Sequence, residues 1–112
     1  MVKRAYVPER GDIVWLNFDP QSGKEQSGKR PAIILSPANY NGAVGLAIVC
    51  PITSRIKGYP FEVLTDGKKI KGAILADHVK SLDWRSRQAQ FAERSSEQVL
   101  TEVLAKLESV LF

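Results

Sequence analysis

Short apolar runs separated by glycine, proline and polar residues dominate the first half of the chain. Residues 13–18 are rich in β-branched and aromatic side chains, which favours a strand, and Asp19-Pro20 ends it because proline cannot donate to a strand ladder. Residues 32–36 and 46–52 predict two further strands, the first apolar enough to be buried on both faces. Asn41-Gly42 between them is a tight-turn signal, so these two strands are predicted to form an antiparallel hairpin. Pro51 predicts a sheet edge or a bulge at the end of the second one.

The second half of the chain continues as short β segments and then changes period. Residues 61–64 and 72–80 are predicted to be extended, and in a regular strand His78 would share a face with Ala76 and Lys80. From residue 97 to residue 111, apolar side chains recur at spacings of three and four, which predicts an amphipathic helix that begins with a Ser95–Gln98 capping box. The apolar stripe of this helix fits two roles equally well: closing one end of the sheet, or packing on a partner subunit.

Together these elements predict a mainly β (α+β) fold in a single domain over residues 1–112. Five or six short strands with one terminal helix indicate a small, strongly bent sheet. A parallel sheet is excluded because no helix-length segment separates the strands. The apolar content of 44% and the charged content of 25% are ordinary for a globular domain.

The composition excludes several classes of protein and site. The sequence contains no run of about 18 apolar residues, so no membrane-spanning helix is predicted. Residues 1–10 lack the apolar stretch of a signal peptide. Cys50 is the one cysteine, and its apolar surroundings indicate a small buried side chain rather than a nucleophile. One histidine, one cysteine and scattered carboxylates give no metal-ligand spacing. We therefore expect a soluble protein of a reducing compartment that uses no metal and no cofactor.

The placement of charge says more than the formal total of +4. Residues 31–53 contain no Asp, Glu, Lys or Arg. If this block is an antiparallel hairpin, Arg30 and Thr53 lie at the same end of it, and an arginine fork beside a hydroxyl suits a phosphate. Basic side chains of the bordering loops are predicted to crowd the same rim: Lys24, Lys29, Arg30, Arg55 and Lys57. A simpler interpretation pairs Arg30 with Glu25 or Asp19 at the surface and bonds Thr53 to backbone.

Other side chains are candidates for chemistry or for binding unpaired bases. His78 is the only side chain that ordinarily titrates near neutral pH, although a lone histidine is more often structural. Glu25 is either a general base or a plain loop carboxylate. Phe18 and Tyr59 border the basic loops and are candidate stacking platforms. Trp15 is expected in the core, and residues 84–87 are expected to combine packing with a solvated basic patch.

Five collinear motifs resemble those of the MazF/PemK toxins. They are Gly11-Asp12-Ile13-Val14-Trp15 with Phe18-Asp19-Pro20; Gly23-Lys24-Glu25-Gln26-Ser27-Gly28-Lys29-Arg30-Pro31, in the pattern G-x-E-Q-x-G-x-R-P; Pro51-Ile52-Thr53-Ser54; Lys57-Gly58-Tyr59-Pro60-Phe61-Glu62-Val63; and Ala76-Asp77-His78-Val79-Lys80-Ser81-Leu82-Asp83-Trp84-Arg85. Each motif alone is weak, whereas five in order are specific. The resemblance is strongest to the MazF branch.

This resemblance implies a fold and an activity. The fold is a small SH3-like β-barrel of the PemK/CcdB kind, with short helices and a C-terminal amphipathic helix. The activity is that of an mRNA interferase, the toxin of a type II toxin–antitoxin system, which cleaves single-stranded RNA at a short sequence without metal or ribosome. By resemblance, Arg30, Thr53 and Glu25 are the catalytic residues. The residues predicted to bind RNA are Phe18, Gln26, Lys29, Lys57, Tyr59, Asp77 and His78.

The implied mechanism is attack by the substrate's own 2′-OH on the adjacent phosphorus, leaving a 2′,3′-cyclic phosphate and a 5′-OH. Arg30 and Thr53 would stabilise the charge on the phosphoryl oxygens. Because arginine is a poor base, Glu25 or His78 is expected to share the proton transfer. Many relatives carry glutamine at the position of His78, so a base-reading role there is as good an interpretation as a catalytic one.

Two other classes of protein stay open at this point. A non-enzymatic, gyrase-poisoning toxin would share the architecture but leave the pair of Arg30 and Thr53 without a purpose. A plain RNA-binding barrel would need no catalytic pair. The family also implies a homodimer in the bacterial cytoplasm and a MazE-like antitoxin with an acidic, extended C-terminal segment, in a heterohexamer-type complex as one arrangement.

Overall fold

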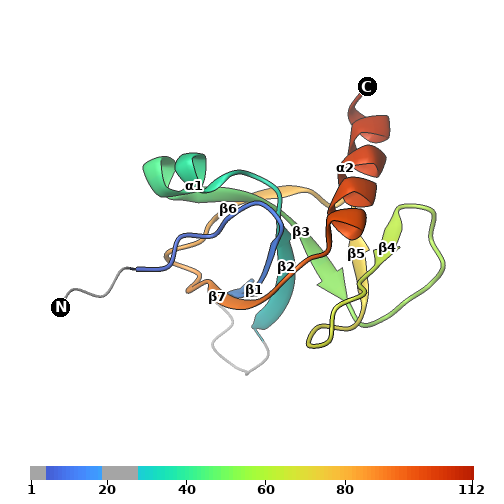
Figure 1. The fold of residues 1–112 in the computed structure, drawn as a ribbon, viewed down its shortest axis with the longest axis horizontal. Helices are drawn as coiled ribbons and strands as arrows, with labels where there is room; N and C mark the ends of the chain where they lie inside the picture. The colour runs from blue at the N-terminus through green and yellow to red at the C-terminus, as the bar shows by residue number, and fades with distance from the viewer. Residues whose placement is uncertain (1–4, 19–27) are drawn as a thin grey trace.

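A computed structural model describes residues 5–18 and 28–112 of the chain. Within these ranges the chain forms seven strands and two helices (Figure 1). The strands are β1 (Asp12–Asn17), β2 (Lys29–Ile34), β3 (Leu46–Thr53), β4 (Glu62–Leu64), β5 (Ala73–Leu75), β6 (Lys80–Asp83) and β7 (Gln90–Arg94). The helices are α1 (Ala38–Val44) and α2 (Glu97–Leu111). The predictions for Lys24, Glu25 and Gln26, and for the end of the first strand at Asp19-Pro20, lie outside the described residues.

Every strand pair is antiparallel, as the absence of long crossovers predicted. The strands follow the order β4-β5-β3-β2-β1-β7, and β6 also pairs with β3. The end strands β4 and β7 are not paired with each other in the described part of the chain, so the sheet is bent but open. The fold is mainly β as predicted, and the predicted barrel is an incomplete one because these end strands do not pair. Figure 1 shows α2 beside β4 and β5, with α1 at the opposite end.

The predicted antiparallel arrangement of β2 and β3 is confirmed. Ala32 lies opposite Pro51, and Ile33 lies opposite Cys50. Pro51 is not at a sheet edge, because β3 is a central strand. Its other side is where β3 changes neighbour, from β6 over residues 46–49 to β5 over residues 52–53. The residue that lacks an N–H thus occupies the place where the ladder on that side is interrupted.

The connection between β2 and β3 is helix α1, so the tight turn predicted at Asn41-Gly42 is wrong. The Asn41 side chain is buried and bonded from both ends: its Nδ2 donates to the carbonyls of Pro8 at 2.8 Å and Ser36 at 2.9 Å, and its Oδ1 accepts from the Ser36 hydroxyl at 2.5 Å. Gly45 ends the helix at a φ of +82°, in the left-handed region that favours glycine. Long-range hydrogen bonds to Asn41 therefore outweigh its local turn preference.

The segment 72–80 is two strands rather than one. After β5 the chain turns, with the His78 N–H donating to the Leu75 carbonyl at 3.0 Å, and β6 begins at Lys80. The strand alternation assumed for His78 is therefore wrong. Strand β7 was not predicted at all.

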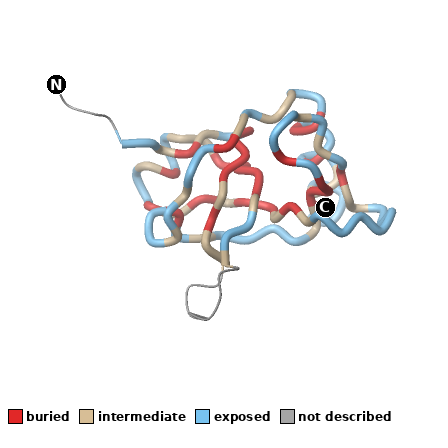
Figure 2. Tube along the Cα trace, turned by 90° about the horizontal axis from the view of Figure 1, so that it is seen from below, coloured by how far each residue is buried: buried red, intermediate tan, exposed pale blue. Residues whose placement is uncertain are grey.

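Buried side chains cover both faces of the central strands, as β2 was predicted to show. The middle of the chain trace in Figure 2 is mostly buried, while the connecting loops are exposed. On one face a cluster gathers side chains of β1–β5 and α2, among them Ile13, Ile33, Cys50, Ile74 and Val103. On the other face a second cluster consists of Val14, Leu16, Ala32, Ile34, Ala47, Val49 and Trp84. Sandwiching β2 in this way fixes the position of its exposed N-terminal end.

Helix α2 spans the predicted residues, but its cap is Ser96 rather than Ser95. The Ser96 Oγ accepts from the Val99 N–H at 3.1 Å. Val99 and Val103 are buried against the sheet, so the first turns of the apolar stripe close one end of the core. The last residue, Phe112, is 96% exposed. Neither helix in the described ranges is long and apolar enough to cross a membrane.

Candidate active site

An open cavity of about 870 Å³ lies where β2 begins and β3 ends. Three stretches of the chain line it: the start of β2 with Trp15 beside it, the end of β3 with the residues that follow, and the β4–β5 loop. The lining residues are Trp15, Lys29, Arg30, Pro31, Ile52, Thr53, Ser54, Arg55, Lys69, Ile70 and Lys71.

Arg30 and Thr53 meet in this cavity, as their placement around the uncharged block predicted. Continuing the register of β2 and β3 towards these ends sets Arg30 level with Thr53. The Thr53 Oγ1 accepts from the Arg55 N–H at 3.1 Å, so the backbone bond of the simpler interpretation is also present. As an acceptor of that bond, the hydroxyl keeps its own proton available for a ligand oxygen.

The charge of the cavity has one sign. Its cationic side chains are Lys29, Arg30, Arg55, Lys69 and Lys71, and no carboxylate is found among the described residues that line it. Lys29 is fixed in part by the bond from its Nζ to the Gln90 Oε1, at 2.9 Å. Such a surface favours a polyanion, because each cation can pair with a phosphate.

Two basic loops border the cavity. We call residues 54–61, which follow β3, the first basic loop, and residues 65–72, which join β4 to β5, the second basic loop. The first was predicted from its arginine and lysine. The contribution of the second, Lys69 and Lys71, was missed, although the run Lys68-Lys69-Ile70-Lys71 is a visible charge signal. Trp15, expected in the core, contacts both the core and the cavity.

A second cavity of about 290 Å³ adjoins the first and shares two of its residues, Thr53 and Arg55. Its remaining lining comes from the first basic loop, from β4, from the end of β5 and from the turn that follows: Lys57, Tyr59, Glu62, Leu75 and His78. The structure therefore brings the predicted RNA-binding residues Lys57, Tyr59 and His78 together beside Thr53.

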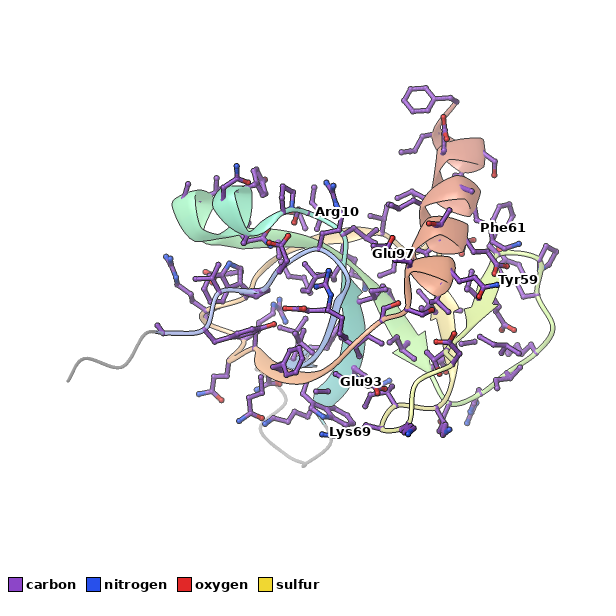
Figure 3. All side chains as sticks on the ribbon, in the orientation of Figure 1. Arg10, Tyr59, Phe61, Lys69, Glu93 and Glu97 are labelled. Atoms are coloured by element: carbon purple, nitrogen blue, oxygen red, sulfur yellow. The ribbon has the colours of Figure 1, made fainter. Side chains whose placement is uncertain are left out.

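Asp77 lines neither cavity but is bonded to Tyr59, which lines the second one. The Tyr59 hydroxyl donates to the Asp77 Oδ2 at 2.6 Å, and this bond raises the pKa of Tyr59. The Asp77 Oδ1 accepts no hydrogen bond from the described residues and lies 3.8 Å from the His78 Nε2. Tyr59 also packs against Phe61, with ring centroids 5.8 Å apart, on the side of the molecule near α2 (Figure 3). The tyrosine ring is thereby fixed in one orientation.

The structure does not bring Phe18 or Cys50 to either cavity. Phe18 packs on the buried cluster around Trp84, with the Lys80 Nζ 5.7 Å from its ring centroid. Cys50 is buried, and burial together with the nearby charge of Asp77 raises the pKa of its thiol to about 12. An un-ionised, enclosed thiol is a poor nucleophile. Trp84 is buried and Arg85 stacks on it at 4.8 Å, as predicted for that segment.

The described residues hold no group of three or more His, Cys, Asp or Glu side chains able to bind a metal ion. The side chains that converge on the cavity can bind anionic oxygens and donate hydrogen bonds. They offer the means to hold a phosphodiester and to stabilise added charge on it.

The sequence of the chain matches a known protein family and its characterised members. The pattern of PemK-like, MazF-like toxins of type II toxin–antitoxin systems matches residues 9–111. The endoribonuclease toxin MazF of Escherichia coli (strain K12) is 52% identical over 89 residues, which cover 80% of this chain and 79% of that protein.

Solved structures agree with the sequence match. MazF from Deinococcus radiodurans is 56% identical and superposes with a TM-score of 0.86, covering 96% of this chain and 98% of that one. A MazE–MazF structure from the same organism is 51% identical, also with a TM-score of 0.86, covering 96% of this chain and 97% of that one. The chain belongs to the PemK-like, MazF-like family of toxins of type II toxin–antitoxin systems.

Proposed function

We propose that the larger cavity is the RNA-cleaving site of this toxin endoribonuclease, with Arg30 and Thr53 on the phosphate at which the chain is cut. One observation carries the proposal: Arg30 and Thr53, from different strands, line a cavity with five cationic side chains and no carboxylate among its described residues. That arrangement is suited to a phosphodiester whose charge increases in the transition state.

The proposed reaction uses the substrate as its own nucleophile. The 2′-oxygen bonds to phosphorus while the bond from phosphorus to the 5′-oxygen breaks, giving a 2′,3′-cyclic phosphate and a 5′-OH. The proton of the 2′-OH passes to a base, and the departing 5′-oxygen takes up a proton. Arg30 stays protonated and binds the phosphoryl oxygens, and the Thr53 hydroxyl donates a further bond.

Glu25 and His78 are the two candidates for proton transfer. Glu25 belongs to the predicted catalytic set and lies outside the described residues. His78 lines the second cavity and not the one that contains Arg30, which favours contact with a neighbouring base over proton transfer. We therefore propose that the second cavity receives a nucleobase beside the reacting phosphate, with Tyr59 and His78 as its polar contacts, Asp77 orienting Tyr59, and Lys57 near the RNA backbone.

The test is incubation of purified protein with a pool of single-stranded transcripts in EDTA, followed by mapping of the new ends. We expect wild type to produce 2′,3′-cyclic phosphate and 5′-OH ends at a short sequence. Arg30→Ala should lower the rate by about 100-fold or more, the loss seen when one charge-stabilising donor is removed. Thr53→Ala should cost less.

Arg85→Ala is the matched control, since Arg85 is an exposed arginine that stacks on Trp84 and lines neither cavity. If wild type leaves RNA intact and behaves like Arg30→Ala, the enzyme proposal is wrong. RNA binding without cleavage would indicate a plain RNA-binding protein, and neither binding nor cleavage would favour a toxin of the gyrase-poisoning kind.

Partners follow from the relatives and from the charge. Because a relative is known as a MazE–MazF structure, we propose an antitoxin partner for this chain in the bacterial cytoplasm, with an acidic extended segment attracted by the cationic cavity. We also propose a homodimer, for which the exposed apolar end of α2, including Leu111 and Phe112, offers surface. Light scattering with and without the antitoxin would measure both.

A further inference from the structure

The second basic loop has no helix or strand of its own, yet it supplies two of the cations of the larger cavity. Thr65 and Gly72 close its base, with the Thr65 N–H donating to the Gly72 carbonyl at 3.0 Å and the Gly72 N–H donating to the Thr65 Oγ1 at 3.1 Å. Within the loop, the Thr65 hydroxyl also donates to the Ile70 carbonyl at 2.8 Å, and the Lys71 Nζ donates to the Gly67 carbonyl at 3.0 Å. None of these bonds holds the backbone amides of Lys68, Lys69 and Ile70, which need a separate support.

That support is the carboxylate of Glu93, which comes from β7. Its Oε1 accepts from the Lys68 N–H at 3.1 Å and from the Lys69 N–H at 3.2 Å, and its Oε2 accepts from the Ile70 N–H at 2.8 Å. Figure 3 shows Glu93 and Lys69 together at the edge of the molecule beside this loop. A single carboxylate thus gathers three successive backbone amides, which form a concave anion-binding nest.

The fit between Glu93 and the loop is close. A Cβ on Gly67 would lie 2.5 Å from the Glu93 Oε2, so any larger residue there would push the carboxylate out of its present position. Burial raises the pKa of Glu93, but the three backbone hydrogen bonds together with Lys69 outweigh it and lower the pKa below its usual value. The carboxylate is therefore charged throughout the neutral range, when its acceptor strength is greatest.

Glu93 itself does not line the cavity. It lies in an edge strand, directly after an irregularity in the pairing of β7 with β1, where Ile13 is opposite Glu93 but Val14 is opposite Phe91. A bulge of this kind re-aims the side chains next to it. The sheet thereby directs one carboxylate out to the loop.

We propose that Glu93 is a positioning residue for RNA binding: by holding the amides of the second basic loop, it keeps Lys69 and Lys71 in the cavity wall, where they contact RNA phosphates beside the reacting one. This inference rests on the proposed RNA-cleaving function of the cavity. Glu93 acts through the loop and touches no substrate.

The first experiment measures the loop without RNA. We expect the amides of Lys68, Lys69 and Ile70 to exchange with deuterium about tenfold or more slowly in wild type than in Glu93→Ala, because the alanine variant offers none of them a charge-assisted bond. Glu93→Gln should fall between them, since it retains one oxygen acceptor. Amides of α2 serve as the internal reference for folding. Unprotected amides at these three positions in wild type would refute the proposal that Glu93 holds the loop.

The second experiment measures RNA. Glu93→Ala should raise KM about tenfold and leave kcat within about twofold, as expected when uniform binding is weakened. The dependence of log KM on log salt should become shallower by about 0.7 for each phosphate of the single strand that the variant no longer neutralises. The double variant Lys69→Gln/Lys71→Gln should show the same slope, and adding Glu93→Ala to it should change nothing further.

The matched control is Glu102→Gln, an exposed glutamate of α2. A fall in kcat with KM unchanged, or full additivity of Glu93→Ala with the two lysine changes, would refute the positioning role. Failure of wild type to cleave any RNA would refute the proposed function instead. In that case hydrogen exchange still decides whether Glu93 holds the loop, and binding of an uncleavable 2′-O-methyl oligonucleotide decides whether Lys69 and Lys71 contact the strand.

Discussion

The two basic loops border the same cavity, and in each of them a glutamate carboxylate accepts hydrogen bonds from successive backbone amides. They differ in how far along the chain that glutamate lies. In the first basic loop, the Glu62 carboxylate accepts from the Lys57 N–H at 3.1 Å and from the Gly58 N–H at 2.9 Å, so the closing group lies within a few residues of the amides it holds. In the second basic loop, the closing carboxylate is Glu93, more than twenty residues further along the chain. The conformation of the first loop is therefore held by contacts within its own segment of the chain. The conformation of the second loop depends on the position of β7 in the sheet.

The largest expected effect tests how firmly each loop is fixed to the site. A Cβ on Gly72 would collide with the backbone carbonyl of Thr53, which cannot move without moving β3. Gly72→Ala should therefore destabilise the protein by roughly 2–3 kcal/mol and lower kcat through Thr53. Gly58→Ala, in open space at a φ of +78°, should cost only about 1 kcal/mol. Urea denaturation of both variants gives the comparison, and equal losses would contradict it.

The next effect separates a residue shared by both cavities from residues that serve only one. Arg55 lines both cavities, whereas Lys57 lines the smaller and Lys69 the larger. Arg55→Ala should raise KM for RNA about tenfold, and Lys57→Ala or Lys69→Ala about threefold each, if each of these side chains makes a charge-assisted bond to the strand. Steady-state kinetics at one fixed salt concentration would show this ranking. A larger effect of either lysine would mean that the RNA path favours one loop.

A smaller effect distinguishes the Glu93 contact with the second loop from the Glu62 contact with the first loop, by a substitution that changes no charge. Gly67→Ala forces the Glu93 side chain aside, and because that side chain is flexible, global stability should change by about 1 kcal/mol or less. Trypsin should then cut faster after Lys68 and Lys69 but not after Lys57. Faster cutting at all three lysines would show that the loops are coupled rather than independently held.

Acid should act on the second loop through Glu93. Its folded-state pKa lies below the ordinary value of 4.5, so its bonds to the loop are at full strength above pH 4.5 and are lost as the pH falls through the lowered pKa. Amide exchange at Lys69, normalised for intrinsic rate, should therefore be constant from pH 7 to pH 4.5 and rise as the pH falls further. In Glu93→Gln the normalised rate should be independent of pH.

Cys50 provides the smallest effect, because it is buried and lines neither cavity. Its pKa is raised to about 12, so a thiol reagent at pH 8 should react only at the rate of unfolding. Cys50→Ala should leave RNA cleavage unchanged and cost about 1 kcal/mol of stability, as for other small buried truncations. Rapid labelling of the native protein would contradict the enclosed position.

The same contrast between local and remote contacts explains what the sequence revealed. Arg30 and Thr53 could be placed together because the uncharged block between them is apolar enough to dictate two adjacent strands. Lys57 and Tyr59 followed because their loop begins where β3 ends. Lys69 and Lys71 were missed because their place in the cavity depends on Glu93. The hydrogen bonds from this loop to Glu93 join residues more than twenty positions apart, and no local sequence pattern predicts such a bond.

The fold shows the same division. Helix α2 was predicted to its ends because its period of three and four is a local property. Helix α1 was misread as a turn because Asn41 is bonded to Pro8 and Ser36, contacts that exist only once the chain has folded. Strand β7 was missed because its short, partly polar sequence becomes a strand by pairing with β1.

Glu93 holds backbone amides and not side chains, and this has a consequence for how the protein can change. The hydrogen bonds to Glu93 come from the backbone of residues 68–70, and of the side chains there Lys69 adds an electrostatic contribution. The shape of the loop therefore depends little on which side chains the loop presents. An engineer could exchange Lys69 for a neutral or aromatic residue and retain the same loop geometry. The side chains of this part of the cavity wall can therefore change while the Glu93 carboxylate continues to bind the same three backbone amides.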